Sequence, residues 1–292
     1  MPSLKCQILV DDVTEMTRTD CVDITLCTNG VLTYEEIGGH LRPTGTGAVE
    51  IDLTRLKFID PAGLVSLAVI AERARLQRRP VHFRKPEGGD VANYLTRMRL
   101  GDELAGLDVV HDLPQVRERR LGHRLVELRR FDGEAGLDTV AAALVQTYVD
   151  DHPELIQPLY AALDEMARNV LEHSTRSHGY VALQRYDNRG DISFAVGDSG
   201  IGLRKRLAAA IPVPDDRTAI VRAAQVHVTS IGRPGRGRGI SRVIGITGEH
   251  RGSVTLISGA ASGTFRRGLP EPELSDLPAS YPGTLAHVRL SL

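Results

Sequence analysis

Apolar and polar residues follow two different periods along the chain, and the changes between them predict its elements. In the first half, short alternating runs predict strands, and apolar residues three or four apart predict helices. The predicted strands are 7–10, 22–26, 48–53, 81–83 and 107–111, and the predicted helices are 34–41, 61–77 and 91–98. Asp60 and Pro61 suit a helix start, because Asp is a favoured N-cap and Pro fits the first turn. Strands that alternate with helices indicate a mixed, largely parallel sheet.

The second half has long helices first and antiparallel strands afterwards. Helical patterns cover 137–149, 154–174 and 240–247, with a further helical stretch within 203–228. Strands are expected at 179–186, 191–196, 253–258, 264–267 and 283–290, with a turn at 259–263 and a Pro-rich loop at 269–282. The charged segment before these elements has no clear period. The fold class is therefore α/β, with domains at 1–115 and 136–292, a linker at 116–135, and a C-terminal sandwich of one helical layer on one sheet.

One predicted helix, 154–174, carries three polar residues on a single stripe. Glu165, Asn169 and His173 are four residues apart, so their side chains lie along one face. Apolar residues occupy the other side, namely Leu163, Met166, Ala167, Val170 and Leu171. Such a stripe can hold a proton acceptor beside an oxygen ligand for a hard metal. Taken alone, each of the three is equally compatible with a solvated helix face.

Three glycine-containing segments follow this helix. Asp198-Ser199-Gly200-Ile201-Gly202 comes directly after a strand, where an Asp can accept a hydrogen bond from an amine and glycines let the backbone approach a flat ligand. The segment 232–239 is rich in Gly and Arg and runs straight into a helix, which suits a phosphate chain. Gly283-Thr284 begins the last strand. Singly, each segment is also compatible with a turn or a solvated loop.

The order of these segments resembles that of the GHKL (Bergerat-fold) ATPases, which include histidine-kinase catalytic domains and anti-sigma-factor serine kinases. The resemblance covers about 136–292 and implies ATP and Mg²⁺ as ligands. It implies that Asn169 ligates Mg²⁺, that Asp198 binds the adenine amine, and that Glu165 is the catalytic base. It further assigns the base pocket and the phosphate lid to Gly200, Gly202, Gly235, Arg236, Gly237, Arg238, Gly239 and Thr284. His173 is expected to shape this site and not to react.

The first half resembles a STAS domain, as in anti-sigma-factor antagonists, over roughly residues 20–115. The resemblance is carried by 49–53, by 58–64 and by the long helix that follows. In that family a phosphorylatable serine stands at the start of this helix, but here the positions are Pro61 and Ala62, which cannot accept a phosphoryl group. Ser66, one turn later, is more simply a helix-face residue. We therefore expect a docking or dimerising domain that is no longer a substrate.

Composition narrows the possible partners. Acidic and basic residues almost cancel, with a net charge of −1, and aromatic residues make up only 4% of the chain. A nucleic acid is therefore not an expected partner, despite the Arg-rich segment. The cysteines are Cys6, Cys21 and Cys27; their odd number and spacing argue against disulfides and zinc. Without a signal peptide or a long apolar run, we expect a cytoplasmic protein that does not contact membranes.

Several functions agree with these patterns. The first is a regulatory ATP-dependent serine/threonine kinase or ATPase that acts on a partner protein, such as a STAS-type antagonist or a sigma factor. The second is an ATP-gated interaction switch that transfers no phosphate. A histidine-kinase-like enzyme with His123 as acceptor is disfavoured, because the usual His-Glu spacing is missing. A homodimer is compatible with either of the first two.

Overall fold

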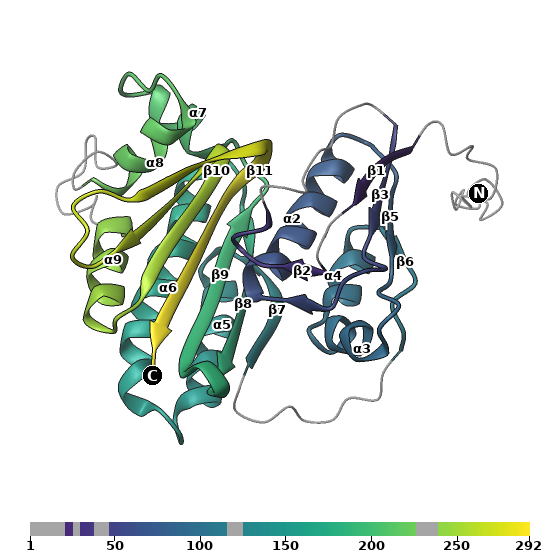
Figure 1. Cartoon of the computed structure of the whole chain (residues 1–292), viewed down its shortest axis with the longest axis horizontal. Coiled ribbons are helices and arrows are strands. Elements are labelled where there is room, and N and C mark those ends of the chain that lie inside the picture. Colours follow the sequence, from purple (N-terminus) through teal and green to yellow (C-terminus); the bar gives the residue numbers. More distant parts are fainter. Residues whose placement is uncertain (1–20, 26–29, 38–46, 116–124, 226–238) are drawn as a thin grey trace, which may run out of the picture.

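The computed structural model describes residues 21–25, 30–37, 47–115, 125–225 and 239–292. Over these residues the chain is a mixed α/β protein with three sheets of four, five and two strands (Figure 1). The α/β class expected from the sequence is therefore confirmed. The predicted strand 7–10, the second half of the predicted helix 34–41, His123 and the segment 235–238 lie outside the described residues.

The first half is built on a parallel sheet of order β1-β3-β5-β6. Its strands are β1 Cys21–Thr25, β3 Ala48–Asp52, β5 Val81–Arg84 and β6 Val110–His111. A short parallel pair, β2 Val31–Leu32 and β4 Phe58–Ile59, lies beside it. The helices are α2 Pro61–Leu76, α3 Gly89–Arg97 and α4 Leu100–Gly106. The helix start inferred at Asp60 is confirmed, because its Oδ1 accepts a hydrogen bond from the Gly63 N–H at 2.7 Å.

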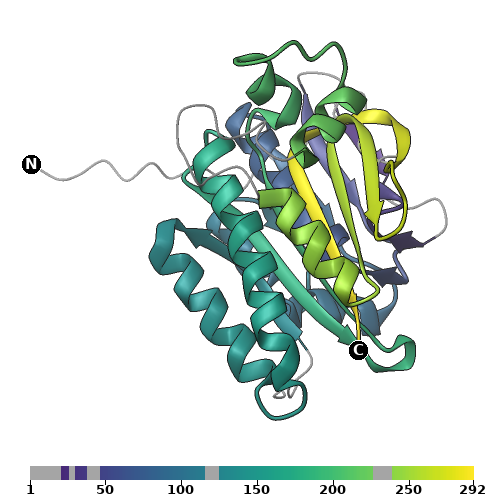
Figure 2. The same ribbon diagram turned by 90° about the vertical axis from the view of Figure 1, so that its left-hand side faces the viewer.

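The second half is built on an antiparallel sheet of order β10-β11-β9-β8-β7. Its strands are β7 Leu125–Asp132, β8 His178–Tyr186, β9 Asp191–Asp198, β10 Ser253–Arg266 and β11 Glu273–Ser291. The helices are α5 Gly133–Tyr148, α6 Pro153–His173, α7 Gly202–Ala208, α8 Asp216–Ala224 and α9 Gly239–Glu249. Figure 2 shows α5, α6 and α9 lying over one face of this sheet.

Helix α2 lies between the two halves and covers the other face of the five-stranded sheet (Figure 1). All but three of its residues are buried, which is expected when a helix is apolar on every side. Side chains alternate across β8 and β9 accordingly. Tyr180 and Ala195 pack in one core with α2, whereas Val181 and Val196 pack in the other core with α5 and α6. The sheet is thus covered on both faces, not on one as expected.

The segment interpreted as a linker contains an edge strand. β7 occupies Leu125–Asp132 and α5 begins at Gly133, inside the expected 116–135 linker. A register shift against β8 lies between Val126 and Arg129, so the buried residues do not keep a strict period of two. The interpretation of 125–135 as linker was therefore wrong, and the shift explains why no alternation was recognised there.

Two long strands replace the expected chain of short ones near the C-terminus. β10 runs through the expected turn 259–263, and β11 includes much of the expected loop 269–282. Pro278 and Pro282 lie where the pairing between β10 and β11 shifts register, namely between Asp276 and Tyr281 and between Tyr281 and Thr284. Proline lacks the N–H that a ladder needs, so it is tolerated at such irregularities. Here proline marked interruptions of the ladder and not the end of a strand.

No helix in the described part of the chain is long and apolar enough to cross a membrane.

Candidate functional site

Helix α6 supplies one wall of a pocket and positions the polar stripe. Leu163, Met166 and Val170 are buried in the core, and the neighbouring stripe with Glu165, Asn169 and His173 is half-buried at the helix surface. Asn169 and His173 line the pocket, and Glu165 lies one turn away at its rim. The face predicted from the spacing is therefore the face that meets the pocket.

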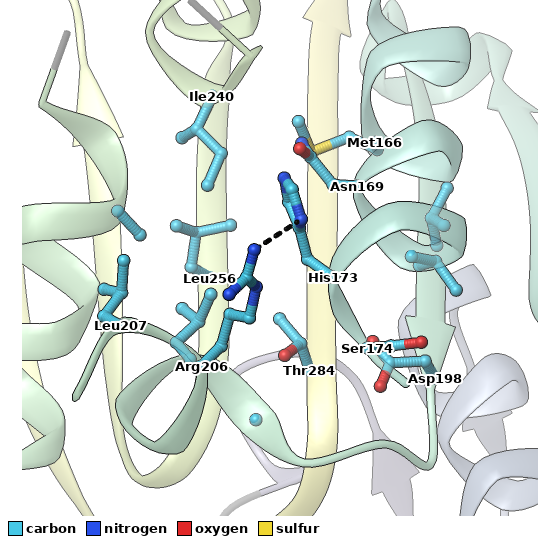
Figure 3. Close-up of a pocket in the computed structure, with 15 residues that line it drawn as sticks. Met166, Asn169, His173, Ser174, Asp198, Arg206, Leu207, Ile240, Leu256 and Thr284 are labelled. Atoms are coloured by element: carbon cyan, nitrogen blue, oxygen red, sulfur yellow. Dashed lines mark hydrogen bonds between the residues drawn. The ribbon is translucent and has the colours of Figure 1, made fainter. Parts of the chain in front are cut away.

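Asp198 is the last residue of β9 and lies at the base of the same pocket (Figure 3). Its residue surface is only 2% exposed, and its Oδ1 accepts a hydrogen bond from the Gly200 N–H at 2.7 Å. Burial raises the pKa of Asp198 to about 7; the Gly200 amide opposes this shift and the charge of Glu72 adds to it. A buried carboxyl that faces a cavity is able to change its protonation state near neutral pH, and to accept hydrogen bonds from a ligand.

The glycines around Asp198 stand where a side chain would not fit. A Cβ on Gly200 would lie 2.0 Å from the Ser174 carbonyl oxygen, and one on Gly283 would lie 2.0 Å from that of Asp198. Gly202 has a positive φ of 75° and begins α7. These residues let the 198–202 turn lie directly against the loop after α6, where the Ile201 N–H donates to the Ser174 carbonyl. The turn is therefore fixed by close backbone packing.

Thr284 pairs with Asp198 across the β9–β11 ladder, so the two side chains emerge on the same face of the sheet. Both line the pocket (Figure 3). The rest of the lining is mostly apolar and comes from α6, β9, α7, α8, α9 and β10: Met166, Val170, Val196, Leu203, Leu207, Ala223, Ile240 and Leu256. An apolar cleft with a few convergent polar groups is the usual form of a small-molecule site.

Gly239, the first residue of α9, brings the end of the Gly/Arg-rich segment to the polar stripe. A Cβ at Gly239 would lie 2.6 Å from Glu165 Oε1 and 3.2 Å from Asn169 Nδ2. Gly239 therefore leaves room beside both side chains. Gly235, Arg236, Gly237 and Arg238, which were assigned to the same lid, lie outside the described residues.

Two arginines near the stripe were not recognised from the sequence. Arg206 of α7 reaches across the pocket, where its Nη2 lies 3.5 Å from His173 Nδ1 (Figure 3). Arg242 of α9 lies 4.0 Å from Glu165 Oε2. Neither belongs to a glycine segment, and their placement depends on how α7 and α9 pack. Only their position one helical turn after Gly202 and Gly239 could have suggested that they lie close to the site.

The polar side chains of the stripe have shifted proton affinities. Burial raises the pKa of Glu165, and the nearby charge of Arg242 opposes this shift. Burial lowers the pKa of His173, and the positive charge of Arg206 acts in the same direction. His173 is thus biased towards the neutral form that accepts from Arg206, and the carboxylate of Glu165 is made a stronger proton acceptor.

The residues around the pocket fit a hard metal ion that takes most of its ligands from groups other than protein side chains. Among the described residues, no group of three or more His, Cys, Asp or Glu side chains could hold a metal ion by itself. The Asn169 amide Nδ2, however, is buried without a hydrogen-bond partner in the described part of the chain. Since the two ends of a carboxamide can exchange by a flip, this group has an oxygen to offer to a cation or to a ligand.

The structure thus gathers Asn169, His173, Asp198, Gly202 and Thr284 around one pocket. Glu165 and Gly239 lie beside Asn169, and Gly200 belongs to the turn that follows Asp198. These residues come from segments that are far apart in the sequence. No protein-family model matches the chain, and no curated protein matches it with significant similarity.

Proposed function

We propose that this protein is a Mg-ATP-binding regulatory protein whose second half, about 136–292, is of the GHKL (Bergerat) type. One observation carries the proposal. Asn169, Asp198, Gly202 and Thr284, which the sequence singled out in three separate segments, line a single pocket. Unrelated turns and helix faces would have no reason to converge in this way. The proposed first half is a STAS-like domain without a phosphoacceptor serine at its helix start.

The proposed roles follow from the chemistry of each side chain. Asp198 accepts a hydrogen bond from the exocyclic amine of adenine, with Thr284 beside it, and the apolar wall with Leu256 packs on the base. Asn169 contributes a carboxamide oxygen to Mg²⁺, which keeps waters and binds phosphate oxygens for its other positions. Arg206 and Arg242 add positive charge next to the phosphates. ATP supplies the phosphoryl group that is transferred.

Glu165 is proposed to accept a proton from the nucleophile, a hydroxyl of a partner protein or a water. Its raised pKa and its place beside Asn169 support this role. The acceptor is not expected in cis. Ala62 carries no hydroxyl, and Ser66 is 1% exposed with its Oγ 3.3 Å from the Tyr281 hydroxyl. Both lie on α2, on the other face of the sheet. A STAS-type antagonist or a sigma factor is the partner that the resemblance favours.

The alternative is an ATP-gated interaction switch without transfer. The extensive contact of α2 with β8, β9 and β11 favours it, because a first half docked on the nucleotide domain can respond to what binds there. In this version Glu165 has no catalytic task, and bound nucleotide changes which surface a partner meets.

The decisive experiment compares Glu165→Gln with a matched control on the same helix. Asp164→Asn removes the neighbouring carboxylate, which is held by Arg168 at 2.9 Å. We expect Glu165→Gln to retain Mg-ATP affinity in calorimetry but to lose phosphate release or transfer by at least about 100-fold, as removal of a general base does. Asp164→Asn should change neither quantity.

Two other results would decide differently. Wild-type protein that binds Mg-ATP but never releases or transfers phosphate supports the switch. Wild-type protein that does not bind Mg-ATP at all contradicts both versions.

A further inference from the structure

A buried carboxylate of the first half contacts the turn that carries Asp198. Glu72 of α2 is 4% exposed, and its Oε2 accepts a hydrogen bond from the Ser199 hydroxyl. Its Oε1 is hydrogen-bonded to His178 Nε2 and lies 3.6 Å from Arg176 Nη2. All three partners belong to the second half. Glu72 is thus a buried carboxylate at the end of the apolar part of α2, and the partners that the described residues provide for it lie across the boundary between the halves.

The charge of Glu72 is maintained by these partners. Burial by itself would raise the pKa of Glu72, but the hydrogen bonds from His178 and Ser199, together with Arg176, hold it below its ordinary value. Two further charged groups reach the cluster through His178, whose Nδ1 lies 3.2 Å from Arg130 and 3.7 Å from Asp132. An ionised group that is buried to this extent costs free energy unless it is paired, so its partners are tightly specified.

The residues on both sides of Asp198 are held from the α2 face. Ser199 is 1% exposed and bound to Glu72. Gly197 packs so closely on α2 that a Cβ there would lie 2.7 Å from Val65 Cγ1. Asp198 itself points the other way, into the pocket. The direction of its carboxylate therefore depends on contacts that the first half makes with its two neighbours.

We propose that Glu72 is a positioning residue of the nucleotide pocket, through which the docked first half sets the affinity of the second half for an adenine nucleotide. Glu72 fixes Ser199 and with it the 198–202 turn, so that the Asp198 carboxylate faces the base. The inference rests on the proposed function. It adds that the nucleotide site is completed by both halves and that loosening of α2 weakens it.

The test is a double-mutant cycle of Glu72→Gln and Ser199→Ala, read as the dissociation constant for Mg-ADP at pH 8.5. Each single variant should weaken binding about tenfold, the usual effect of losing one hydrogen bond to a charged group. The double variant should be hardly weaker than either single one, because both remove the same contact. The control is Tyr94→Phe, which removes a hydroxyl bound to Gln184 at 2.5 Å in the same interface but at the far end of β8.

A second measurement, the pH profile of Mg-ADP affinity, shows whether Glu72 positions Asp198 or only supports the fold. The negative charge of Glu72 helps to raise the pKa of Asp198, with Arg176 opposing it. Glu72→Gln should therefore move the acid limb of the Mg-ADP affinity profile to lower pH, whereas Tyr94→Phe leaves it in place. The titration of the nucleotide cancels, since every variant is compared with wild type on the same ligand.

The outcomes distinguish the two proposals. Weaker binding in both single variants, non-additivity and a shifted limb support the inference. If wild type binds Mg-ADP and depends on Asp198, but Glu72→Gln and Ser199→Ala bind as wild type does, the inference is overturned and the proposed function stands. If wild type does not bind Mg-ADP, both are overturned.

Discussion

Two aspartates end strands in the two halves and show how similar surroundings serve different purposes. Asp60 follows β4 and Asp198 ends β9; they are 5% and 2% exposed, and burial raises the pKa of both. Asp60 uses both oxygens within the fold, accepting from the Gly63 N–H at 2.7 Å and from the Tyr34 N–H at 3.2 Å. Asp198 accepts from the Gly200 N–H and lines a pocket. Burial alone thus does not identify a binding residue; the surface that the carboxylate faces does.

The largest difference is expected in nucleotide affinity. Asp198→Asn replaces the acceptor that we assign to the adenine amine by a group that can present a donor, so affinity for Mg-ATP should fall by at least about 1,000-fold. Asp60→Ala should leave the affinity unchanged, because Asp60 lies at the opposite end of α2 from Glu72. Calorimetry on both variants tests the comparison. Tight binding by Asp198→Asn would remove Asp198 from the site.

The next difference is in the pH dependence of stability. Burial raises the pKa of Asp198 to about 7 and of Asp60 to about 6, above an ordinary 3.8. Each carboxyl therefore stabilises the fold fully below about pH 4, and this contribution is lost as pH rises through the folded value. The nucleotide-free protein should lose up to about 1.4 kcal/mol per pH unit for each group.

Variants of the two aspartates show over which pH range each one affects stability. The contributions of both carboxyls fall between about pH 4 and 6, and only that of Asp198 continues to fall up to about pH 7. Asp198→Asn should therefore make the decline shallower below about pH 6 and abolish it above, so that the nucleotide-free variant is the more stable protein at pH 8. Asp60→Ala should make the decline shallower between about pH 4 and 6 and leave the part between about pH 6 and 7 in place. Denaturant titrations over this pH range measure both. Parallel curves for wild type and Asp198→Asn would mean that Asp198 keeps an ordinary pKa in the folded protein.

The sequence contained enough to single out several residues that line the pocket, but not the residues that contact them from other elements. Asn169, Asp198 and Thr284 each lie in a short pattern with a local requirement, such as a helical spacing, a strand end or a glycine turn. Arg206 and Arg242 could not be found in this way, because only the packing of α7 and α9 brings them to the site. Glu72 was missed for a similar reason, since its partners are more than 100 positions away in the sequence.

The sequence nevertheless contained a sign that the two halves pack against each other. The stretch Leu64–Ala71 contains only one polar residue, Ser66, so this helix is apolar on all sides and has to be covered all round. β9 is likewise buried at every position, which is typical of a strand with both faces covered. The order of helices first and antiparallel hairpins afterwards had indicated a sandwich of one helical layer on one sheet. The continuous apolar runs were the better guide.

The smallest difference is expected in the folding role of Asp60. Asp60→Ala removes the acceptor for the Gly63 and Tyr34 amides and should lower stability by about 1–2 kcal/mol at pH 5, as the loss of a helix cap does. This cost should shrink as pH rises through about 6, because the variant no longer buries a charge. Asp198→Asn should not show the cost, since an amide oxygen can still accept from Gly200. Equal losses of stability in the two variants at pH 5 would mean that Asp198, like Asp60, serves to stabilise the fold, although it faces a pocket.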